Sequence, residues 1–173
     1  MGTKRSEIFL MRELNTFKSM TELLRKKGVE FKNLILKQEV IEANYYISKQ
    51  LNVPLATKIF YLERLRVIEG NPLSVEKIFI CYDRVKGMEK EEIGSQSFYG
   101  LLDRKYGYKV KKSKEEILIV EANERERELL ELRKGEEVLL IKGNTFLGEN
   151  AHFEYFELAS LPSFYHFRSV SII

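Results

Sequence analysis

The sequence predicts an α+β fold in which one curved antiparallel sheet carries helices between groups of strands. The apolar residues of the stretch 59–80 are β-branched or aromatic and fit no helical period, which is typical of strands. Two glycine-containing turns, at residues 69–72 and 148–150, join pairs of such segments as hairpins. Short segments with capping residues lie between these groups and predict helices. Strands in antiparallel order with helices between them define the α+β class.

The stretch 59–80, IFYLERLRVIEGNPLSVEKIFI, predicts the central hairpin. A two-residue loop would place Arg64 opposite Lys77 and Leu65 opposite Glu76, which is a poor pairing. A three-residue loop at residues 69–71 pairs residues of matching character on one face. These pairs are Tyr61 with Phe79, Glu63 with Lys77, Leu65 with Val75, and Val67 with Leu73.

The other face of this hairpin carries an unexpected charge pair. Arg64 and Arg66 point the same way, because residues two apart on a strand share a face. Two guanidinium groups roughly 7 Å apart on a half-buried face are costly unless an anion lies between them, and their fork suits phosphate or carboxylate. The face therefore predicts an anion site, in which Glu76 accepts a hydrogen bond from a hydroxyl or amine group of the ligand. The alternative is a surface-facing strand whose arginines pair with acids on a neighbour.

Capping residues and periodicity predict the remaining elements. Residues 1–12 show no strong period and form either a strand or the remnant of an upstream linker. Ser19 or Thr21 caps a helix over residues 22–26 that Gly28 ends. The other predicted elements are a strand at 32–40, a helix at 42–51, short turns at 83–94, a helix at 97–106, a strand at 109–120, a helix at 124–134 that Asn123 caps and Gly135 ends, strands at 137–147 and 151–159, and a last strand at 165–173.

Two further positions could serve a ligand. The predicted helix at 97–106 begins beside the hydroxyls of Ser95, Ser97 and Tyr99, and a helix N-terminus favours anions. The alternative is that Ser95 or Ser97 only caps the helix. Glu154 alternates with apolar residues, so it is either a ligand-binding acid or a solvent-facing acid on an amphipathic strand.

Composition excludes several other classes of function. A length of 173 residues predicts one domain, and a net charge of +3 with dispersed basic runs does not indicate nucleic-acid binding by this chain alone. Cys81, His152 and His166 do not have metal-ligand spacing, and no cofactor motif or catalytic nucleophile motif is present. We expect Cys81 to be a buried small apolar residue. The longest apolar runs are too short for a signal peptide or a membrane span, so we expect a cytoplasmic protein.

Five motifs in order support a resemblance: LERLR, GNPLSVEK, SFYGLLDRKYG, ANERERELLELRKGEEVLLI and FEYFELASLP. Together they resemble the UTRA domain, the effector-binding half of the HutC branch of GntR transcription regulators, over roughly residues 12–173. The resemblance implies a chorismate-lyase-like fold: an antiparallel sheet with helices, a pocket for a small metabolite, and homodimerisation. We therefore expect residues 1–12 to be a linker remnant or an N-terminal strand and residues 13–173 to be the effector-binding and dimerisation domain.

The resemblance also implies the ligand-binding residues. In sugar-phosphate-sensing members the ligand is held by positions that correspond to Thr21, Arg64, Arg66, Glu76, Ser97, Tyr99 and Glu154. The arginines, hydroxyls and helix N-terminus would take the phosphate, and the glutamates would take sugar hydroxyl or amide groups. Where many members carry tyrosine followed by arginine after the last glutamate, this chain has Ser160 and Leu161. The resemblance implies a winged helix before the domain, and this sequence holds none, so we expect the chain to be either an excised part of a regulator or a sensor domain that stands alone.

Three functions remain open from the sequence. The first is a non-enzymatic sensor for a small anionic metabolite, a sugar phosphate or a carboxylate, that acts as a homodimer. It would meet DNA only through a winged-helix domain outside this chain and would use no catalytic residue, metal, cofactor or membrane. The second is a chorismate-lyase-like enzyme with arginine clamps and Glu76 as acid or base. The third is a domain that only dimerises.

Overall fold

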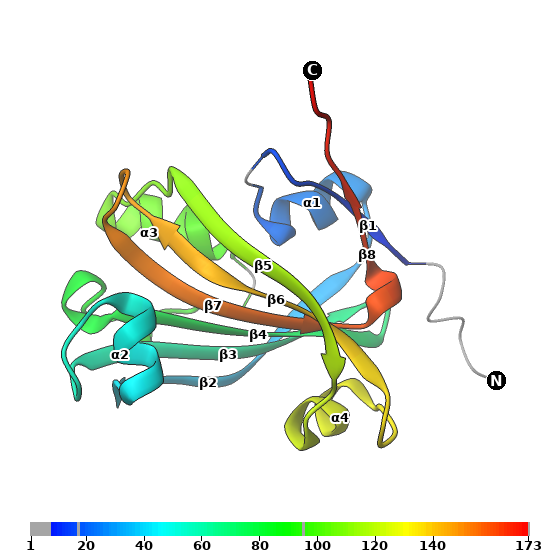
Figure 1. Ribbon diagram of the computed structural model, residues 1–173, viewed down its shortest axis with the longest axis horizontal. Coiled ribbons are helices and arrows are strands. Elements are labelled where there is room, and N and C mark those ends of the chain that lie inside the picture. Colours follow the sequence, from blue (N-terminus) through cyan, green and yellow to red (C-terminus); the bar gives the residue numbers. More distant parts are fainter. Residues whose placement is uncertain (1–7, 17, 95, 173) are drawn as a thin grey trace.

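The computed structural model describes residues 8–16, 18–94 and 96–172 (Figure 1). Its main element is a six-stranded antiparallel sheet with the strand order β2-β3-β4-β7-β6-β5. The strands are β2 Phe31–Glu42, β3 Lys58–Ile68, β4 Asn71–Cys81, β5 Lys112–Glu121, β6 Glu137–Phe146 and β7 His152–Ser160. The helices are α1 Met20–Lys27, α2 Tyr45–Leu51, α3 Phe98–Tyr106 and α4 Glu124–Leu130. The predicted α+β class is confirmed.

The chain ends form a second sheet, so the prediction of a single sheet is wrong. Strand β1, Leu10–Glu13, pairs in parallel with β8, Tyr165–Arg168. The chain leaves the large sheet after β7 because Pro162 has no N–H to continue a ladder and starts a 3₁₀ turn, Pro162–Phe164. The last strand ends at Arg168, and Ile173 lies outside the described residues. Residues 1–7 of the predicted first segment also lie outside them.

The central hairpin has the predicted register over most of its length. Tyr61 pairs with Phe79, Glu63 with Lys77 and Leu65 with Val75. The predicted loop is wrong, because Ile68 pairs with Asn71 and only two residues, Glu69 and Gly70, form the turn. Both have positive φ, 48° and 77°, as a type I′ turn requires. A bulge after Arg66 restores the register, so Val67 faces Pro72 instead of Leu73.

Two helices begin at predicted caps, since Ser19 and Ser97 each accept a hydrogen bond from a backbone N–H of their own helix. The predicted start of the next helix at residue 42 is wrong: Glu42 ends β2, and α2 begins at Tyr45 with Asn44 as its cap. Thr21 lies inside α1, so Ser19 is the cap. Helix α4 is shorter than predicted: it begins after Asn123 but ends at Leu130, because Glu131 adopts the left-handed conformation with φ 54°. Leu132 then packs against the core, which is the apolar contact that stabilises such an end.

The two faces of the large sheet carry different helices. We call the face that carries Phe60, Arg64, Arg66, Glu76 and Glu154 the arginine face. On it, Phe98 of α3 stacks over Phe60 with ring centroids 6.5 Å apart. On the opposite face, α2 packs its Ile47 and Leu51 against Ile59, Phe79 and Tyr155. Figure 1 shows α1 beside the small sheet, on the same side of the large sheet as α3. Among the described residues, no helix is long and apolar enough to cross a membrane.

Gly143 on β6 pairs with Glu115 of β5, and the backbones of the two strands approach closely here. This approach brings Glu115 to the arginine face. A Cβ at Gly143 would lie 2.2 Å from the Lys114 carbonyl oxygen and 2.9 Å from Glu115 Cα, which are backbone atoms. We expect Gly143→Ala to lower the free energy of unfolding by about 1–3 kcal/mol in urea denaturation. Gly148→Ala is the control, since its Cβ would meet nothing within 4 Å. Equal stability of the two variants would contradict this expectation.

Candidate functional site

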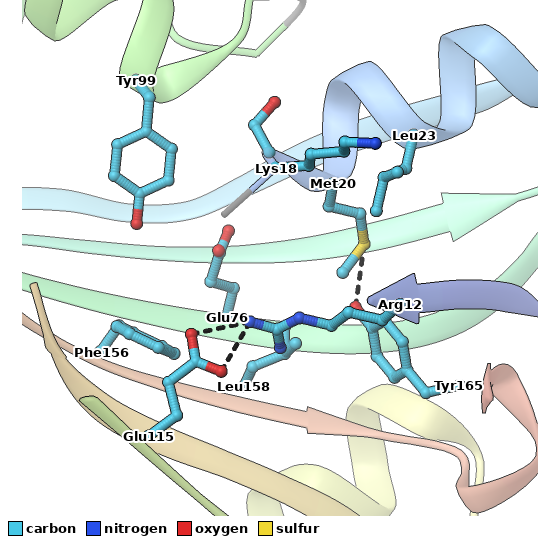
Figure 2. Close-up of a pocket in the computed structure, with 11 residues that line it drawn as sticks. Arg12, Lys18, Met20, Leu23, Glu76, Tyr99, Glu115, Phe156, Leu158 and Tyr165 are labelled. Carbon is cyan, nitrogen blue, oxygen red and sulfur yellow. Dashed lines mark hydrogen bonds and ion pairs between the residues drawn. The ribbon is translucent and has the colours of Figure 1, made fainter. Parts of the chain in front are cut away.

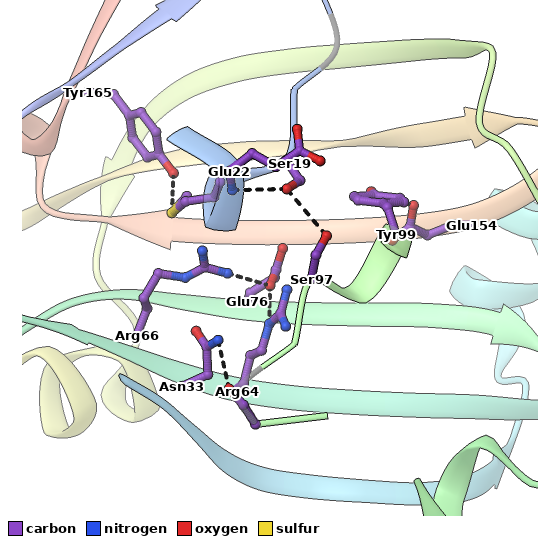
Figure 3. Close-up of polar contacts among 12 residues, drawn as sticks. Ser19, Glu22, Asn33, Arg64, Arg66, Glu76, Ser97, Tyr99, Glu154 and Tyr165 are labelled. Carbon is purple, nitrogen blue, oxygen red and sulfur yellow. Dashed lines mark hydrogen bonds and ion pairs between the residues drawn. The ribbon is translucent and has the colours of Figure 1, made fainter. Parts of the chain in front are cut away.

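The centre of the candidate site is the pair Arg64 and Arg66 on β3. Their side chains are only 4% and 1% exposed. The alternative prediction that this strand faces solvent is therefore wrong. Glu76, opposite Arg64 on β4, forms an ion pair with Arg64 Nε and a longer one, 3.4 Å, with Arg66 Nη2 (Figure 3). One carboxylate for two guanidinium groups leaves the trio with an excess positive charge.

Several polar atoms beside this trio are buried without a hydrogen-bond partner among the described residues. They are Arg64 Nη1, Arg66 Nε and Nη1, Ser74 Oγ and Ser160 Oγ. The register places three of these residues in one row, since Ser74 pairs with both Arg66 and Ser160. A buried polar atom that lacks a partner costs about 1–3 kcal/mol. The cluster therefore fits a ligand with several acceptor oxygens, or ordered water in its place.

Burial opposes the charge on Arg66. Desolvation, reinforced by the neighbouring Arg64, lowers the pKa of Arg66 to about 10, although Glu76 acts in the other direction. For Glu76, burial would raise the pKa, but the charges and hydrogen bonds of Arg64 and Arg66 outweigh it and hold the pKa below its ordinary value. Glu76 is therefore ionised, and Arg66 is the cation that the fold stabilises poorly.

Two helix N-termini meet above the trio. Ser19 and Ser97, the caps of α1 and α3, place their Oγ atoms 3.4 Å apart (Figure 3). Each hydroxyl also accepts a backbone N–H, from Glu22 and Gly100 respectively. The capping role predicted for Ser97 is thus present, and the N-terminal ends of both helices favour negative charge at this point. Ser95 lies outside the described residues.

Glu154 forms a second polar group on the arginine face. It is 0% exposed, so its interpretation as a solvent-facing acid is wrong. Its Oε2 accepts from Tyr99 Oη at 2.8 Å and from Thr145 Oγ1 at 2.9 Å, and its Oε1 has no partner among the described residues. Burial raises the pKa of Glu154 to about 7, although these two hydrogen bonds act to lower it. Burial also raises the pKa of Tyr99, so Tyr99 is the proton donor of the pair.

A cavity of about 60 Å³ lies between these groups (Figure 2). It is lined by Arg12, Lys18, Ser19, Met20, Leu23, Glu76, Tyr99, Glu115, Phe156, Leu158 and Tyr165. A water molecule needs about 10–15 Å³ of such space, so the cavity admits a group of several heavy atoms, such as one phosphate. Its wall combines cations, carboxylates, hydroxyls and apolar side chains, which suits an amphiphilic small anion.

Comparison with known proteins identifies the family. Residues 26–165 match the family model described as the UTRA domain. The chain belongs to the UTRA domain family. Similar curated proteins from Bacillus subtilis are the HTH-type transcriptional regulator TreR, 27% identical over 80% of this chain, and the HTH-type transcriptional repressor NagR, 24% identical over 89%. The match spans 58% of TreR and 63% of NagR, so this UTRA domain corresponds to about three fifths of their length.

Solved structures agree with the fold of this UTRA domain. PhnF from Mycobacterium smegmatis superposes with a TM-score of 0.85 at 17% identity, over 95% of this chain and 72% of that protein. A GntR-family regulator from Enterococcus faecalis is 26% identical, with a TM-score of 0.72 over 80% of this chain and 99% of that one. The predicted membership of the GntR/HutC group and the chorismate-lyase-like fold are confirmed.

The predicted site residues of the UTRA domain converge on one face but do so in layers. Glu76 and Tyr99 line the cavity, and Ser97 contacts the lining residue Ser19. Like Ser97, the other four lie outside its wall: Arg64 and Arg66 contact Glu76, Glu154 contacts Tyr99, and Thr21 is buried in α1 at 2% exposure.

Sequence reasoning missed several lining residues, above all Arg12, Lys18 and Glu115. Phe156 and Leu158 could have been found, since they follow Glu154 at the strand period of two. Arg12 and Glu115 are 103 positions apart and carried no local signal. Among the described residues, no group of three or more His, Cys, Asp or Glu side chains could hold a metal ion, and Cys81, at the end of β4, is only partly buried.

Proposed function

We propose that this UTRA domain is the sensor part of a transcription regulator and binds a small anionic metabolite, a phosphorylated sugar or a carboxylate, at the arginine face. The observation that carries the proposal is the cluster of buried nitrogens on Arg64 and Arg66 that lack a partner among the described residues and lie next to Glu76, which lines the cavity. An anion would satisfy these donors and meet the N-termini of α1 and α3. The names of TreR, NagR and PhnF as regulators or effector domains support the same assignment.

The proposed binding residues follow from this arrangement. Arg64, Arg66, Ser97 and the two helix ends take the anionic group, whereas Glu76 and Glu154 accept hydroxyl or amide groups of the rest of the ligand. We place Thr21 in a supporting role, because it is buried within α1. Binding would change the population of domain arrangements in the regulator, and DNA would be contacted by a separate domain.

A ligand screen tests the proposal. Thermal shift is measured with inorganic phosphate, hexose phosphates, and small mono- and dicarboxylates, and hits are quantified by isothermal titration calorimetry. We expect at least one anion to raise the melting temperature with a saturable dissociation constant, because a ligand that binds only the native state stabilises it. Arg66→Gln is expected to lose that shift. A flat response to the whole panel, or turnover of chorismate to a new product, would contradict a non-catalytic anion sensor.

We also propose that the domain is a homodimer. Edge strand β5 exposes Ile117, Leu118 and Ile119 by 37%, 38% and 51%, and an apolar edge with unpaired backbone groups favours pairing with another copy. We expect light scattering at micromolar concentration to give the mass of two chains. Leu118→Lys and Ile119→Lys together are expected to give monomers, while Lys substitution at the exposed Tyr45, on the helix α2, leaves the dimer intact. A wild-type monomer would contradict the assignment.

A further inference from the structure

The ion pair between Arg12 and Glu115 forms part of the cavity wall. Arg12 lies on β1, and its Nη2 donates to both oxygens of Glu115 on β5, at 2.7 and 2.6 Å (Figure 2). Glu115 Oε1 also accepts from Ser113 Oγ at 2.8 Å. The side chains of Arg12 and Glu115 are 19% and 15% exposed, so the pair is shielded from solvent but not sealed. It joins the small sheet to the edge of the large one.

The same two residues border a second space. A groove of about 570 Å³, which we call the outer groove, is lined by Arg12, Glu115, residues 13–16 at the end of β1 and just after it, residues 111–113 and Ile117. The cavity at the arginine face measures about 60 Å³ on the same scale. That volume accepts a phosphate or carboxylate group but not a whole metabolite, for which pockets of about 300–1,000 Å³ are usual. A larger ligand therefore needs the space on the far side of the ion pair.

The contact is built so that it can open. Both hydrogen bonds to Glu115 come from one nitrogen, Nη2, so the guanidinium fork is not used in the two-nitrogen geometry that makes arginine–carboxylate pairs strongest. Among the described residues of the cavity wall, an entering anion would meet two carboxylates, Glu76 and Glu115, and two cations, Lys18 and Arg12. Turning Arg12 from Glu115 to the anion keeps its charge paired and moves a cation to where it is needed.

We propose that Arg12 and Glu115 form a gate in which the anionic ligand replaces Glu115 as the partner of Arg12. This inference rests on the proposed function, since it needs an anion in the cavity. When Arg12 changes its partner from Glu115 to the ligand, the cavity joins the outer groove, which then receives the uncharged part of the ligand. It also ties β1, and the chain that leads into β1, to the occupancy of the site. Arg12 is thus both a ligand-binding residue and the link between the site and the N-terminal segment.

A double-mutant cycle on the full chain tests the gate, with inorganic phosphate as the probe and NMR titration as the readout. We expect Arg12→Gln to weaken phosphate binding about tenfold. Glu115→Gln, which frees Arg12, should strengthen binding about fivefold, as expected for loss of a weak competing ion pair. In the Arg12→Gln background, Glu115→Gln should give no gain. If Arg12→Gln folds poorly, Arg12→Lys replaces it, since it keeps the charge and loses the fork.

Each result separates this inference from the proposed function. An equal gain from Glu115→Gln with and without Arg12 would mean that Glu115 acts only through its charge, and the gate would be wrong. Phosphate binding that needs Arg66 but ignores Arg12 and Glu115 would likewise overturn the gate and leave the sensor standing. Failure of phosphate and of the wider anion panel to bind the wild-type chain would overturn both.

Hydrogen exchange gives a second readout. A purely electrostatic role of Arg12 would leave the exchange rates in β1 unchanged. We expect saturating phosphate to change amide exchange in residues 10–14 of the wild-type chain and to leave those amides unchanged in Arg12→Gln. Arg168→Gln is the matched control, because Arg168 pairs with Glu13 of β1 but does not line the cavity. It should bind phosphate as the wild type does and show the same change in exchange. A control that behaves like Arg12→Gln would overturn the gate.

Discussion

Replacing Arg66 by glutamine is expected to weaken binding of the anionic ligand by about tenfold or more and to leave the melting temperature of the empty domain unchanged or raised. Arg66 is 1% exposed, makes one 3.4 Å contact with Glu76, and has two nitrogens without a partner among the described residues. Its lowered pKa reports that the fold disfavours this cation. Replacing Arg66 removes a poorly compensated buried charge, so the affinity for the ligand falls more than the stability of the empty domain does.

Arg64→Gln is the matched comparison. Arg64 Nε makes the close contact with Glu76, so its loss leaves that carboxylate with only the longer contact to Arg66. Breaking a buried pair in this way is expected to cost about 3 kcal/mol in urea denaturation. Calorimetric titration and unfolding of both variants provide the measurements. If Arg66→Gln lowers the stability of the empty domain by more than about 2 kcal/mol without changing affinity, both arginines are structural partners of Glu76.

The parts of the fold that the sequence predicted are those with local causes. Ser19, Asn123 and Ser97 specify helix starts through their own hydroxyl or amide oxygens, and the alternation around Arg64 specifies the face of the hairpin. The misses have non-local causes. The pairing of β1 with β8 joins residues more than 150 positions apart, and the early end of α4 depends on where Leu132 finds core to pack against.

The candidate site divides in the same way. Strand periodicity placed Arg64, Arg66 and Glu76 on one face, because their spacing is set within a single hairpin. The layering was not predictable, since it depends on α1 and α3 meeting over Glu76 and on β1 bringing Arg12 to Glu115. The burial of Glu154 is likewise a tertiary effect: Tyr99 from α3 covers a residue whose own strand alternates like a half-exposed one.

Glu154 should make the stability of the empty domain depend on pH. Its carboxyl is fully buried, faces Tyr99 and Thr145 directly, and lies in the opposing fields of Glu76 and Arg64. Burial raises its pKa from the ordinary 4.5 to about 7. Between these two values the folded chain holds a proton that the unfolded chain has lost, so the contribution of Glu154 to stability falls as the pH rises through this window. Below about 4.5 and above about 7 it is constant.

We therefore expect Glu154→Gln to be more stable than the wild type at pH 8 and similar to it at pH 5. A pKa shift of this size corresponds to a difference of about 3 kcal/mol between the two ends of the window. Glutamine can keep one acceptor for Tyr99 or Thr145 and carries no charge that burial penalises.

The free energy of unfolding is measured in urea at pH 5 and pH 8 for the wild type, Glu154→Gln and the control Glu157→Gln. Glu157 lies on the opposite face of β7 and is 27% exposed, and Glu157→Gln changes the net charge by the same amount as Glu154→Gln. A wild type whose pH dependence survives Glu154→Gln unchanged, or disappears equally in Glu157→Gln, would show that the buried carboxyl carries no part of it.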